Sequence, residues 1–77
     1  MALILYTKTG CFFCKKVLDS ARGLGITLEE RNVADDENLK ELMEKGSKRQ
    51  IPFLVDEDKG VSMYESDDII KYLVSRI

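Results

Sequence analysis

The sequence YTKTGCFFC at residues 6–14 joins a predicted strand to a predicted helix. It follows the run ALILY at residues 2–6, which is continuous, apolar and of strand length, as expected for a strand buried on both faces. After a short polar loop, apolar side chains recur on one helical face through residues 12–24, and a glycine on either side of Leu24 ends the helix. Cys11 is therefore expected at the N-terminus of a helix.

The rest of the chain alternates strands and helices in the same way. Residues 26–33 begin with an alternating pattern rich in β-branched residues, which predicts a second strand that is exposed on one side. Two strands joined by a helix are expected to pair in parallel through a right-handed crossover. The remaining predicted elements are a helix that begins at acidic residues 35–37 and ends at 45–46, a hairpin of strands 53–55 and 61–63, and a helix with Ser66 as its N-cap that continues to Ile77. The predicted order is β-α-β-α-β-β-α, an α/β fold.

Size and composition allow one small domain, spanning residues 1–77. The chain has 77 residues, of which 44% are hydrophobic and 34% charged, and it is too short for two domains. Fourteen acidic residues against twelve basic ones give a net charge of −2, so the positive field of a duplex-binding protein is missing. The apolar run at residues 2–6 is far too short for a signal peptide or a membrane span. We expect a soluble, cytoplasmic monomer with neither nucleic acid nor membrane as a partner.

The two cysteines are spaced C-x-x-C, as Cys11 and Cys14, in a chain without histidine. A disulfide between them would close a very short loop and stabilise the fold by only about 2 kcal/mol, which argues against a purely structural bond. Two thiols without histidine do not supply the ligands of a structural zinc site, so no metal is expected. The bland alternative is that both cysteines are small buried hydrophobic residues of a helix.

A thiol at a helix N-terminus is stabilised in its reactive thiolate form by free backbone amides and by the helix dipole. Lys8, in the loop that leads to Cys11, adds a nearby positive charge. Cys14 is expected one turn deeper on the same side of the helix, within reach of a mixed disulfide formed at Cys11. Cys11 is therefore the predicted nucleophile, and Cys14 is the residue predicted to resolve its mixed disulfides.

Four local patterns make the chain resemble a glutaredoxin, a member of the thioredoxin-like superfamily, over essentially its whole length. Residues 6–14 are similar to the family's strand end, lysine-bearing loop and C-x-x-C active site. Residues 50–52 (QIP) stand in the place of the family's Thr-Val-Pro, and Arg49 and Gln50 resemble side chains that contact the glycine carboxylate of glutathione. Residues 64–69 (YESDDI) resemble the segment that holds the γ-glutamyl end, in the Glu-Ser form of glutathione transferase N-terminal domains and some glutaredoxins.

The resemblance implies a four-stranded mixed sheet flanked by three helices, with a cis peptide bond before Pro52. The exposed backbone of Ile51 would pair with glutathione as it would with an added strand. At the start of the last helix, Ser66 and free amides can hold the γ-glutamyl carboxylate while Asp67 meets the ammonium group. The residues implied in glutathione binding are Lys8, Cys11, Phe13, Arg49, Gln50, Ile51, Pro52, Glu65, Ser66 and Asp67.

The chain departs from the glutaredoxin pattern at three places. Phe12 replaces the usual proline and Phe13 the usual tyrosine. We expect at least one of the two rings, with Phe13 favoured, to stay exposed beside the sulfur. Residues 63–66 (MYES) replace the usual Gly-Gly pair before the last helix. Elsewhere, the acidic residues 56–58 are interpreted as turn chemistry and Tyr72 as a packing residue.

The activity that the resemblance implies is glutathione-dependent thiol-disulfide oxidoreduction, with glutathione as co-substrate. The expected protein partners carry disulfides or mixed disulfides with glutathione. One alternative is a redoxin reduced directly by thioredoxin reductase, and another is a carrier of a [2Fe-2S] cluster held by Cys11 of two chains and by two glutathione molecules. A detached, glutathione-transferase-like binding domain is disfavoured because both cysteines are present.

Overall fold

The computed structural model describes residues 3–46 and 48–76. In these residues the elements are β1 (Leu3–Thr7), α1 (Phe12–Gly23), β2 (Glu29–Asn32), α2 (Asp36–Gly46), β3 (Phe53–Asp56), β4 (Val61–Met63) and α3 (Ser66–Ser75). They follow the predicted order β-α-β-α-β-β-α. Ala2 and Ile77, which the sequence places in the first strand and the last helix, lie outside the described residues.

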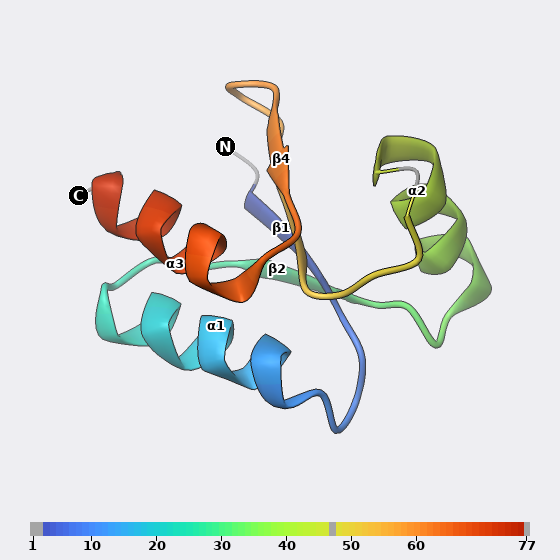
Figure 1. Ribbon diagram of the computed structural model, residues 1–77, viewed down its shortest axis with the longest axis horizontal. Coiled ribbons are helices and arrows are strands. Elements are labelled where there is room, and N and C mark those ends of the chain that lie inside the picture. Colours follow the sequence, from blue (N-terminus) through green and yellow to red (C-terminus); the bar gives the residue numbers. More distant parts are fainter. Residues whose placement is uncertain (1–2, 47, 77) are drawn as a thin grey trace.

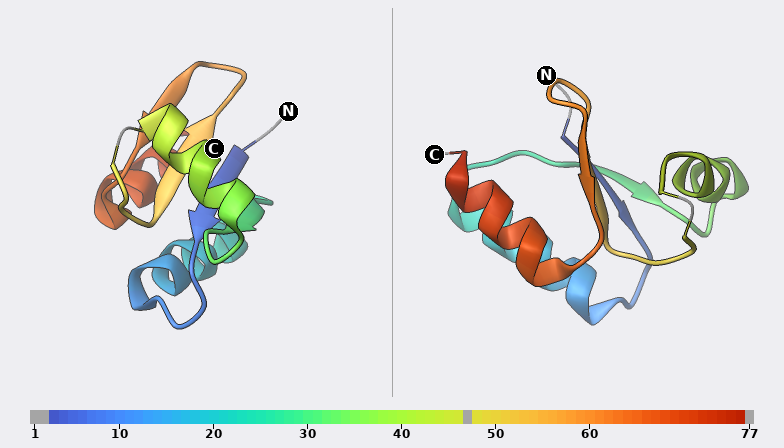
Figure 2. Two further views of the ribbon diagram at one scale, coloured as in Figure 1. Left: turned by 90° about the vertical axis from the view of Figure 1, so that its right-hand side faces the viewer. Right: turned by 45° about the horizontal axis from the view of Figure 1, so that its top comes forward.

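The strands form one mixed sheet in the order β2-β1-β3-β4. Strand β1 pairs in parallel with β2 and antiparallel with β3, and β3 pairs antiparallel with β4 in the predicted hairpin. Helices α1 and α3 pack side by side on one face of the sheet, and α2 lies on the other (Figures 1 and 2). The predicted fold, a thioredoxin-like four-stranded mixed sheet flanked by three helices, is confirmed.

Strand β1 is buried on both faces because helices cover both sides of the sheet. Leu5 belongs to the apolar cluster with Leu54 beneath α1 and α3. Ile4 and Tyr6 alternate with Leu5 along the strand and belong to the cluster beneath α2, together with Phe53. This two-sided burial explains why the first strand reads as a continuous apolar run.

The second strand is shorter than the sequence predicts. Strand β2 contains residues 29–32 rather than 26–33. The N–H of Ile26 donates to the carbonyl of Ala21 at 2.9 Å, so the chain after α1 first closes the end of that helix. Gly25 adopts the positive φ of 73° in this turn. The segment joins the sheet only after the turn is complete.

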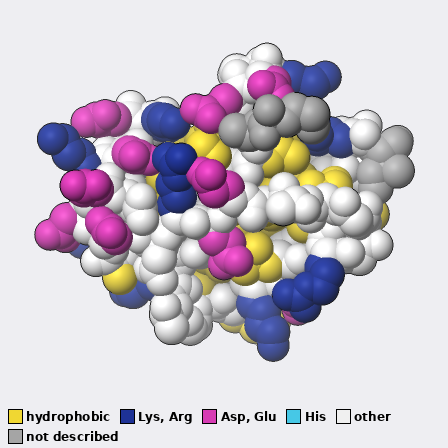
Figure 3. All heavy atoms as spheres, turned by 180° about the vertical axis from the view of Figure 1, so that it is seen from behind, with side chains coloured by type: hydrophobic (Ala, Val, Ile, Leu, Met, Phe, Trp, Pro, Cys, Tyr) yellow, Lys and Arg dark blue, Asp and Glu magenta, His cyan; other side chains and the backbone are white. Residues whose placement is uncertain are grey.

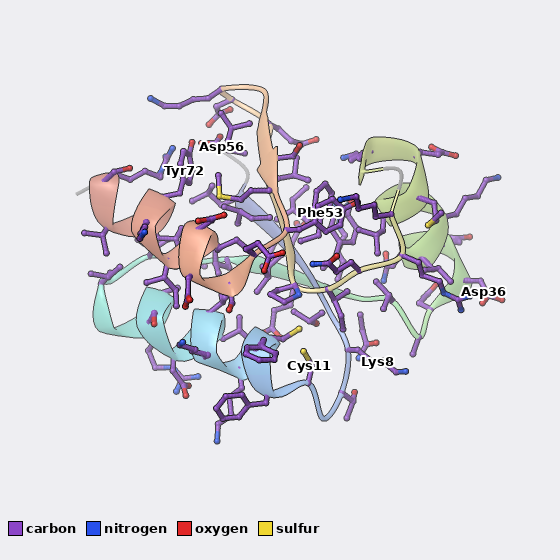
Figure 4. The ribbon with its side chains drawn as sticks, viewed as in Figure 1. Lys8, Cys11, Asp36, Phe53, Asp56 and Tyr72 are labelled. Atoms are coloured by element: carbon purple, nitrogen blue, oxygen red, sulfur yellow. The ribbon has the colours of Figure 1, made fainter. Side chains whose placement is uncertain are left out.

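Asp56 belongs to β3 and is only 1% exposed, so its interpretation as a turn residue was wrong. The Tyr72 hydroxyl donates to Oδ2 of Asp56, and Arg76 donates to the same oxygen at 2.6 Å (Figure 4). Both donors lie at the end of α3, distant in sequence from the acid that they contact. Tyr72 therefore binds a buried carboxylate in addition to packing, and the interaction ties α3 to the sheet.

Charges of both signs are interspersed on the face opposite that of Figure 1, where acidic and basic side chains surround apolar atoms (Figure 3). This distribution agrees with the small net charge of −2. None of the helices in the described part of the chain combines the length and the apolar character of a membrane span.

Candidate active site

Cys11 lies at the N-terminus of α1, as the sequence predicts, and occupies its N-cap position. Its backbone is extended, with φ −78° and ψ 115°, and its Sγ accepts a hydrogen bond from the N–H of Cys14 at 3.2 Å. The N–H of Cys11 in turn donates to the carbonyl of Lys8 at 3.1 Å. The sulfur therefore takes the role that a serine or aspartate oxygen has at other helix N-termini, where negative charge is favoured. Cys11 is partly exposed and forms no disulfide bond with Cys14 in this structure.

Cys14 lies in the first turn of α1 and is only 2% exposed. Burial raises the pKa of its thiol to about 12, and a hydrogen bond to Cys11 adds to the shift. At neutral pH Cys14 is therefore a thiol that faces the sulfur of Cys11. The C-x-x-C spacing has produced two sulfurs in different environments, one accessible at the helix end and one held protonated in the interior.

This difference predicts selective alkylation. At pH 8, a Cys14 thiol with a pKa of about 12 has only about 1 in 10⁴ of its population as thiolate, and burial also blocks its access to reagents. Iodoacetamide is therefore expected to modify Cys11 and to leave Cys14 unmodified. Peptide mass spectrometry after unfolding and a second, distinguishable alkylation would measure both sites. Equal labelling of the two residues under native conditions would contradict the assignment.

The loop before Cys11 is held by the neighbouring parallel strand. Asn32, at the end of β2, donates from its side-chain amide to Oγ1 of Thr9 at 2.9 Å. Its own side-chain oxygen accepts from the N–H of Ala34 at 2.8 Å, which fixes the amide. Sequence analysis did not single out Asn32. The signal available was its register, because parallel strands end at the same edge of a sheet and Asn32 pairs with Thr7.

Lys8 is exposed and lies beside Cys11 at this edge of the sheet (Figure 4). It borders two depressions. One, which we call the cysteine hollow, measures about 200 Å³ and contains Lys8, Cys11 and Cys14 in its lining. The other, the large hollow, measures about 450 Å³ and has Lys8 and Arg49 at an apolar floor that includes Leu39 and Ile51. Two cations among the residues expected to bind glutathione, Lys8 and Arg49, therefore line one depression.

A third depression, the small hollow, lies between the N-terminal turns of α1 and α3. It measures about 250 Å³ and is lined by Phe13, residues 50–52 and residues 64–66. Ile51 lines both the small and the large hollow. The peptide bond between Ile51 and Pro52 is cis, as the resemblance implied. The two hollows thus meet at the segment expected to pair with an extended peptide.

Helix α3 begins at Ser66, so the prediction that Ser66 is the N-cap was wrong. Glu65 holds the N-cap position, with φ −72° and ψ 131°, and its side chain makes no capping hydrogen bond. The carboxylate of Glu65 instead approaches the side-chain amide of Gln50 at 3.4 Å across the small hollow. Because the N-cap side chain does not occupy them, the first amides of α3 are available to a ligand.

Asp67 alone among the predicted glutathione-binding residues lines none of the three hollows. Its carboxylate accepts a hydrogen bond from Nζ of Lys16 at 3.1 Å.

Phe12 and Phe13 contact each other edge to face, with ring centroids 5.5 Å apart. Both rings are largely exposed, by 72% for Phe12 and 55% for Phe13. The expected exposure of Phe13 beside Cys11 is confirmed, and Phe12 shares it.

Within residues 3–46 and 48–76, no three or more histidine, cysteine or acidic side chains are placed to hold a metal ion together. The chemistry available at this end of the sheet is that of the two sulfurs, the free amides of two helix N-termini, and the cations of Lys8 and Arg49, which share the large hollow with one acid, Asp36. Such a set suits attack by a sulfur nucleophile next to a peptide-like, negatively charged ligand.

Known structures have the same fold. The glutathione S-transferase of the Antarctic clam Laternula elliptica is 26% identical, with a TM-score of 0.81, and the match covers 99% of this chain and 35% of that one. Glutathione S-transferase unclassified 2 from Bombyx mori is 23% identical, with a TM-score of 0.82 and coverages of 99% and 36%. A glutathione transferase homolog from Drosophila mojavensis, solved with bound glutathione, is 23% identical, with a TM-score of 0.80 and coverages of 97% and 35%. The chain spans about a third of the length of each.

No curated protein matches the sequence. A family model does match, over residues 5–76, and it describes the N-terminal domain of glutathione S-transferases. The match includes both the C-x-x-C segment and the Glu-Ser segment that the sequence resemblance had related to such domains. Because the model extends over nearly the whole sequence, this chain belongs to the family of glutathione S-transferase N-terminal domains.

Proposed function

We propose that this domain is a glutathione-dependent thiol-disulfide oxidoreductase of the glutaredoxin type, acting through Cys11 and Cys14. The observation that carries the proposal is the pair of unlike sulfurs. Sγ of Cys11, at the N-cap of α1, accepts a hydrogen bond from the N–H of Cys14, and Cys14 itself is buried. A domain that only binds glutathione has no need of a second, protonated thiol next to the first. The pair is what a dithiol mechanism requires.

Glutathione fits the surroundings of Cys11 by its chemistry. Its glycine carboxylate would meet Lys8 and Arg49 in the large hollow, and its backbone would pair with Ile51. Its γ-glutamyl carboxylate would meet Ser66 and the first amides of α3 beside the small hollow. Membership of the glutathione S-transferase N-terminal family supports this assignment, as does the glutathione bound in the homolog from Drosophila mojavensis.

Asp67 would bind the γ-glutamyl ammonium group by exchanging its present partner. Its carboxylate now pairs with Lys16, and the two side chains are 77% and 46% exposed. Exposed ion pairs contribute little to stability, so a ligand ammonium can replace the lysine without a large penalty.

The reaction with a glutathionylated protein then proceeds in two exchanges. The Cys11 thiolate attacks the glutathione sulfur of the mixed disulfide, and the protein sulfur leaves as a thiolate that takes up a proton. A second glutathione, as thiolate, attacks the glutathione sulfur now bonded to Cys11. Glutathione disulfide leaves, and the Cys11 thiolate is restored. Each step forms one S–S bond and breaks one. In the net reaction, the mixed disulfide and one free glutathione give the protein thiol and glutathione disulfide.

With a protein disulfide, Cys14 would complete the reaction. Attack by Cys11 leaves the substrate bonded to Cys11, whose sulfur then carries no charge. The hydrogen bond and the charge by which Cys11 raises the pKa of Cys14 disappear at that moment, although the effect of burial remains. Cys14 becomes more acidic, loses its proton and attacks Sγ of Cys11, which releases the reduced protein. Two glutathione molecules then reduce the bond between Cys11 and Cys14.

Turnover assays with different reductants test this proposal. A glutathionylated peptide is expected to be reduced with glutathione, glutathione reductase and NADPH, and NADPH oxidation follows the rate. Thioredoxin reductase and NADPH without glutathione are expected to give no turnover. The family membership makes conjugation of glutathione to chlorodinitrobenzene the comparison reaction. Conjugation without disulfide reduction, or reduction by thioredoxin reductase alone, would contradict the proposal.

A further inference from the structure

The segment of residues 48–51 carries Arg49, Gln50 and Ile51 to the two hollows, and it has no regular secondary structure. Among the turn and loop hydrogen bonds between backbone groups of the described residues, none involves this segment. Other contacts must therefore hold the segment in place if it is to present Arg49 and Gln50 to a ligand.

Tyr64 provides such contacts. Its hydroxyl accepts a hydrogen bond from the N–H of Lys48 at 3.0 Å and donates one to the carbonyl of the same residue at 3.1 Å. The ammonium group of Lys48 lies over the Tyr64 ring, 5.6 Å from its centroid. The ring itself packs on the buried Phe53, with centroids 4.5 Å apart. One side chain thus anchors both backbone groups of Lys48 to the core.

The end of α2 is shaped to admit this hydroxyl. A Cβ atom at Gly46 would overlap the hydroxyl group of Tyr64 and would also crowd the ring of Phe53. Glycine at this position therefore allows the tyrosine to reach Lys48. The close approach accounts for a glycine, rather than a larger residue, as the last residue of α2.

Tyr64 also connects the two sides of the small hollow. It lines that hollow together with Gln50, from the segment that Tyr64 anchors, and with Glu65 and Ser66, which follow it directly in the chain. Tyr64 belongs to the wall that contains Glu65 and Ser66, and it is hydrogen-bonded to the segment that carries Gln50 on the other wall. The distance between the two walls thus depends on Tyr64.

We infer that Tyr64 is a positioning residue for glutathione: its hydroxyl fixes the segment that presents Arg49 and Gln50 relative to the N-terminus of α3. The inference rests on the proposed function, since glutathione is the ligand whose two ends these walls would hold. Tyr64 lines the small hollow, whereas both sulfurs line the cysteine hollow, so Tyr64 is expected to act on binding rather than on the reactivity of Cys11.

The test is the substitution Tyr64→Phe, which removes both hydrogen bonds to Lys48 and keeps the ring on Phe53. The KM for glutathione is expected to rise about three- to ten-fold, as for the loss of one or two hydrogen bonds. Two other quantities are expected to stay within about two-fold: kcat at saturating glutathione and the alkylation rate of Cys11. Gly46→Ala is expected to give the same pattern because the added methyl group displaces the hydroxyl.

The matched control is Tyr72→Phe, which removes another tyrosine hydroxyl that is bonded to Asp56, away from the hollows. It is expected to lower the thermal midpoint without changing the KM for glutathione. A merely structural role of Tyr64 would give the same result for both variants and would overturn the inference. An unchanged KM in Tyr64→Phe would also overturn it.

Titration calorimetry with S-methylglutathione, which cannot exchange sulfurs, separates this inference from the proposed function. Binding by the wild-type protein without turnover would reject the proposed function, and the ratio of dissociation constants between wild type and Tyr64→Phe would still decide the role of Tyr64. Turnover with unchanged binding in Tyr64→Phe would reject the inference alone. Absence of both binding and turnover in the wild type would reject both.

Discussion

Replacing Cys11 by serine is expected to abolish the reduction of both glutathionylated peptides and protein disulfides, by roughly 10³-fold or more in kcat/KM. A serine hydroxyl at the N-cap of α1 preserves the capping hydrogen bond from the Cys14 amide, so the fold is expected to survive. The serine hydroxyl is far too weak an acid to ionise near neutral pH, so it cannot replace the Cys11 thiolate as the nucleophile. The NADPH-coupled assay measures both activities, and the thermal midpoint confirms folding.

Cys14→Ser is the matched control because it makes the same replacement, oxygen for sulfur, at the other cysteine. This variant is expected to keep the reduction of glutathionylated peptides, which needs only Cys11 and a second glutathione. It is expected to lose most of the reduction of protein disulfides, because the fast intramolecular attack of Cys14 on the disulfide that links the substrate to Cys11 is then missing. Equal losses of both activities in the two variants would refute the distinction between nucleophile and resolving thiol.

The second large effect is expected on stability, from Asp56→Ala. Asp56 is 1% exposed and accepts from Tyr72 and Arg76, so its removal leaves a guanidinium group without its carboxylate at the end of α3. Breaking such a pair from one side is strongly destabilising, and we expect the thermal midpoint to fall by roughly 10 °C or more in a domain of this size. Asp58→Ala, an exposed acid of the adjacent turn, is the control and is expected to have little effect.

The effect of Asp56 is also expected to depend on pH. The Tyr72 hydroxyl, and secondarily the charge of Arg76, hold the pKa of this carboxyl below its ordinary value of 3.8, against the opposing effect of burial. A depressed pKa in the folded state means that the contribution to stability is complete above the unfolded pKa and is lost as pH falls through the folded pKa. The difference in thermal midpoint between wild type and Asp56→Ala should therefore be constant above about pH 5 and shrink in acid. A difference that persists unchanged in strong acid would show that the charge of Asp56 is not its cause.

The fold and the sulfur chemistry could be predicted because they depend on short-range patterns. Whether a run is apolar on one face or both, and where a helix starts, depends on neighbouring residues. Cys11 lies at the helix N-terminus, where the sequence places it, for this reason. Even the errors in element ends, such as the shorter β2 and the displaced N-cap of α3, amount to a few residues and reflect local turn geometry.

The contacts that hold the site together could not be read from the pattern in the same way. Asn32 and Thr9 are 23 residues apart, and Tyr64 and Lys48 are 16 apart, as are Tyr72 and Asp56. Each of these residues has an ordinary local explanation, as a turn, surface or packing residue. Only the tertiary structure, through strand pairing and the packing of the helices on the sheet, brings each one to its partner.

The amino-acid sequence by itself determined the order of the elements, the two-sided burial of β1 and the placement of one sulfur at the start of α1. These follow from hydrophobic spacing and backbone preferences that act over a few residues. The tertiary structure decided which side chains support the surroundings of that sulfur: Asn32 for the loop and Tyr64 for the segment of residues 48–51. It also decided that Tyr72 and Arg76 tie α3 to Asp56, away from the site. The reason is that a hydrogen bond between distant residues exists only once the chain has packed, and its partners carry no periodic signal.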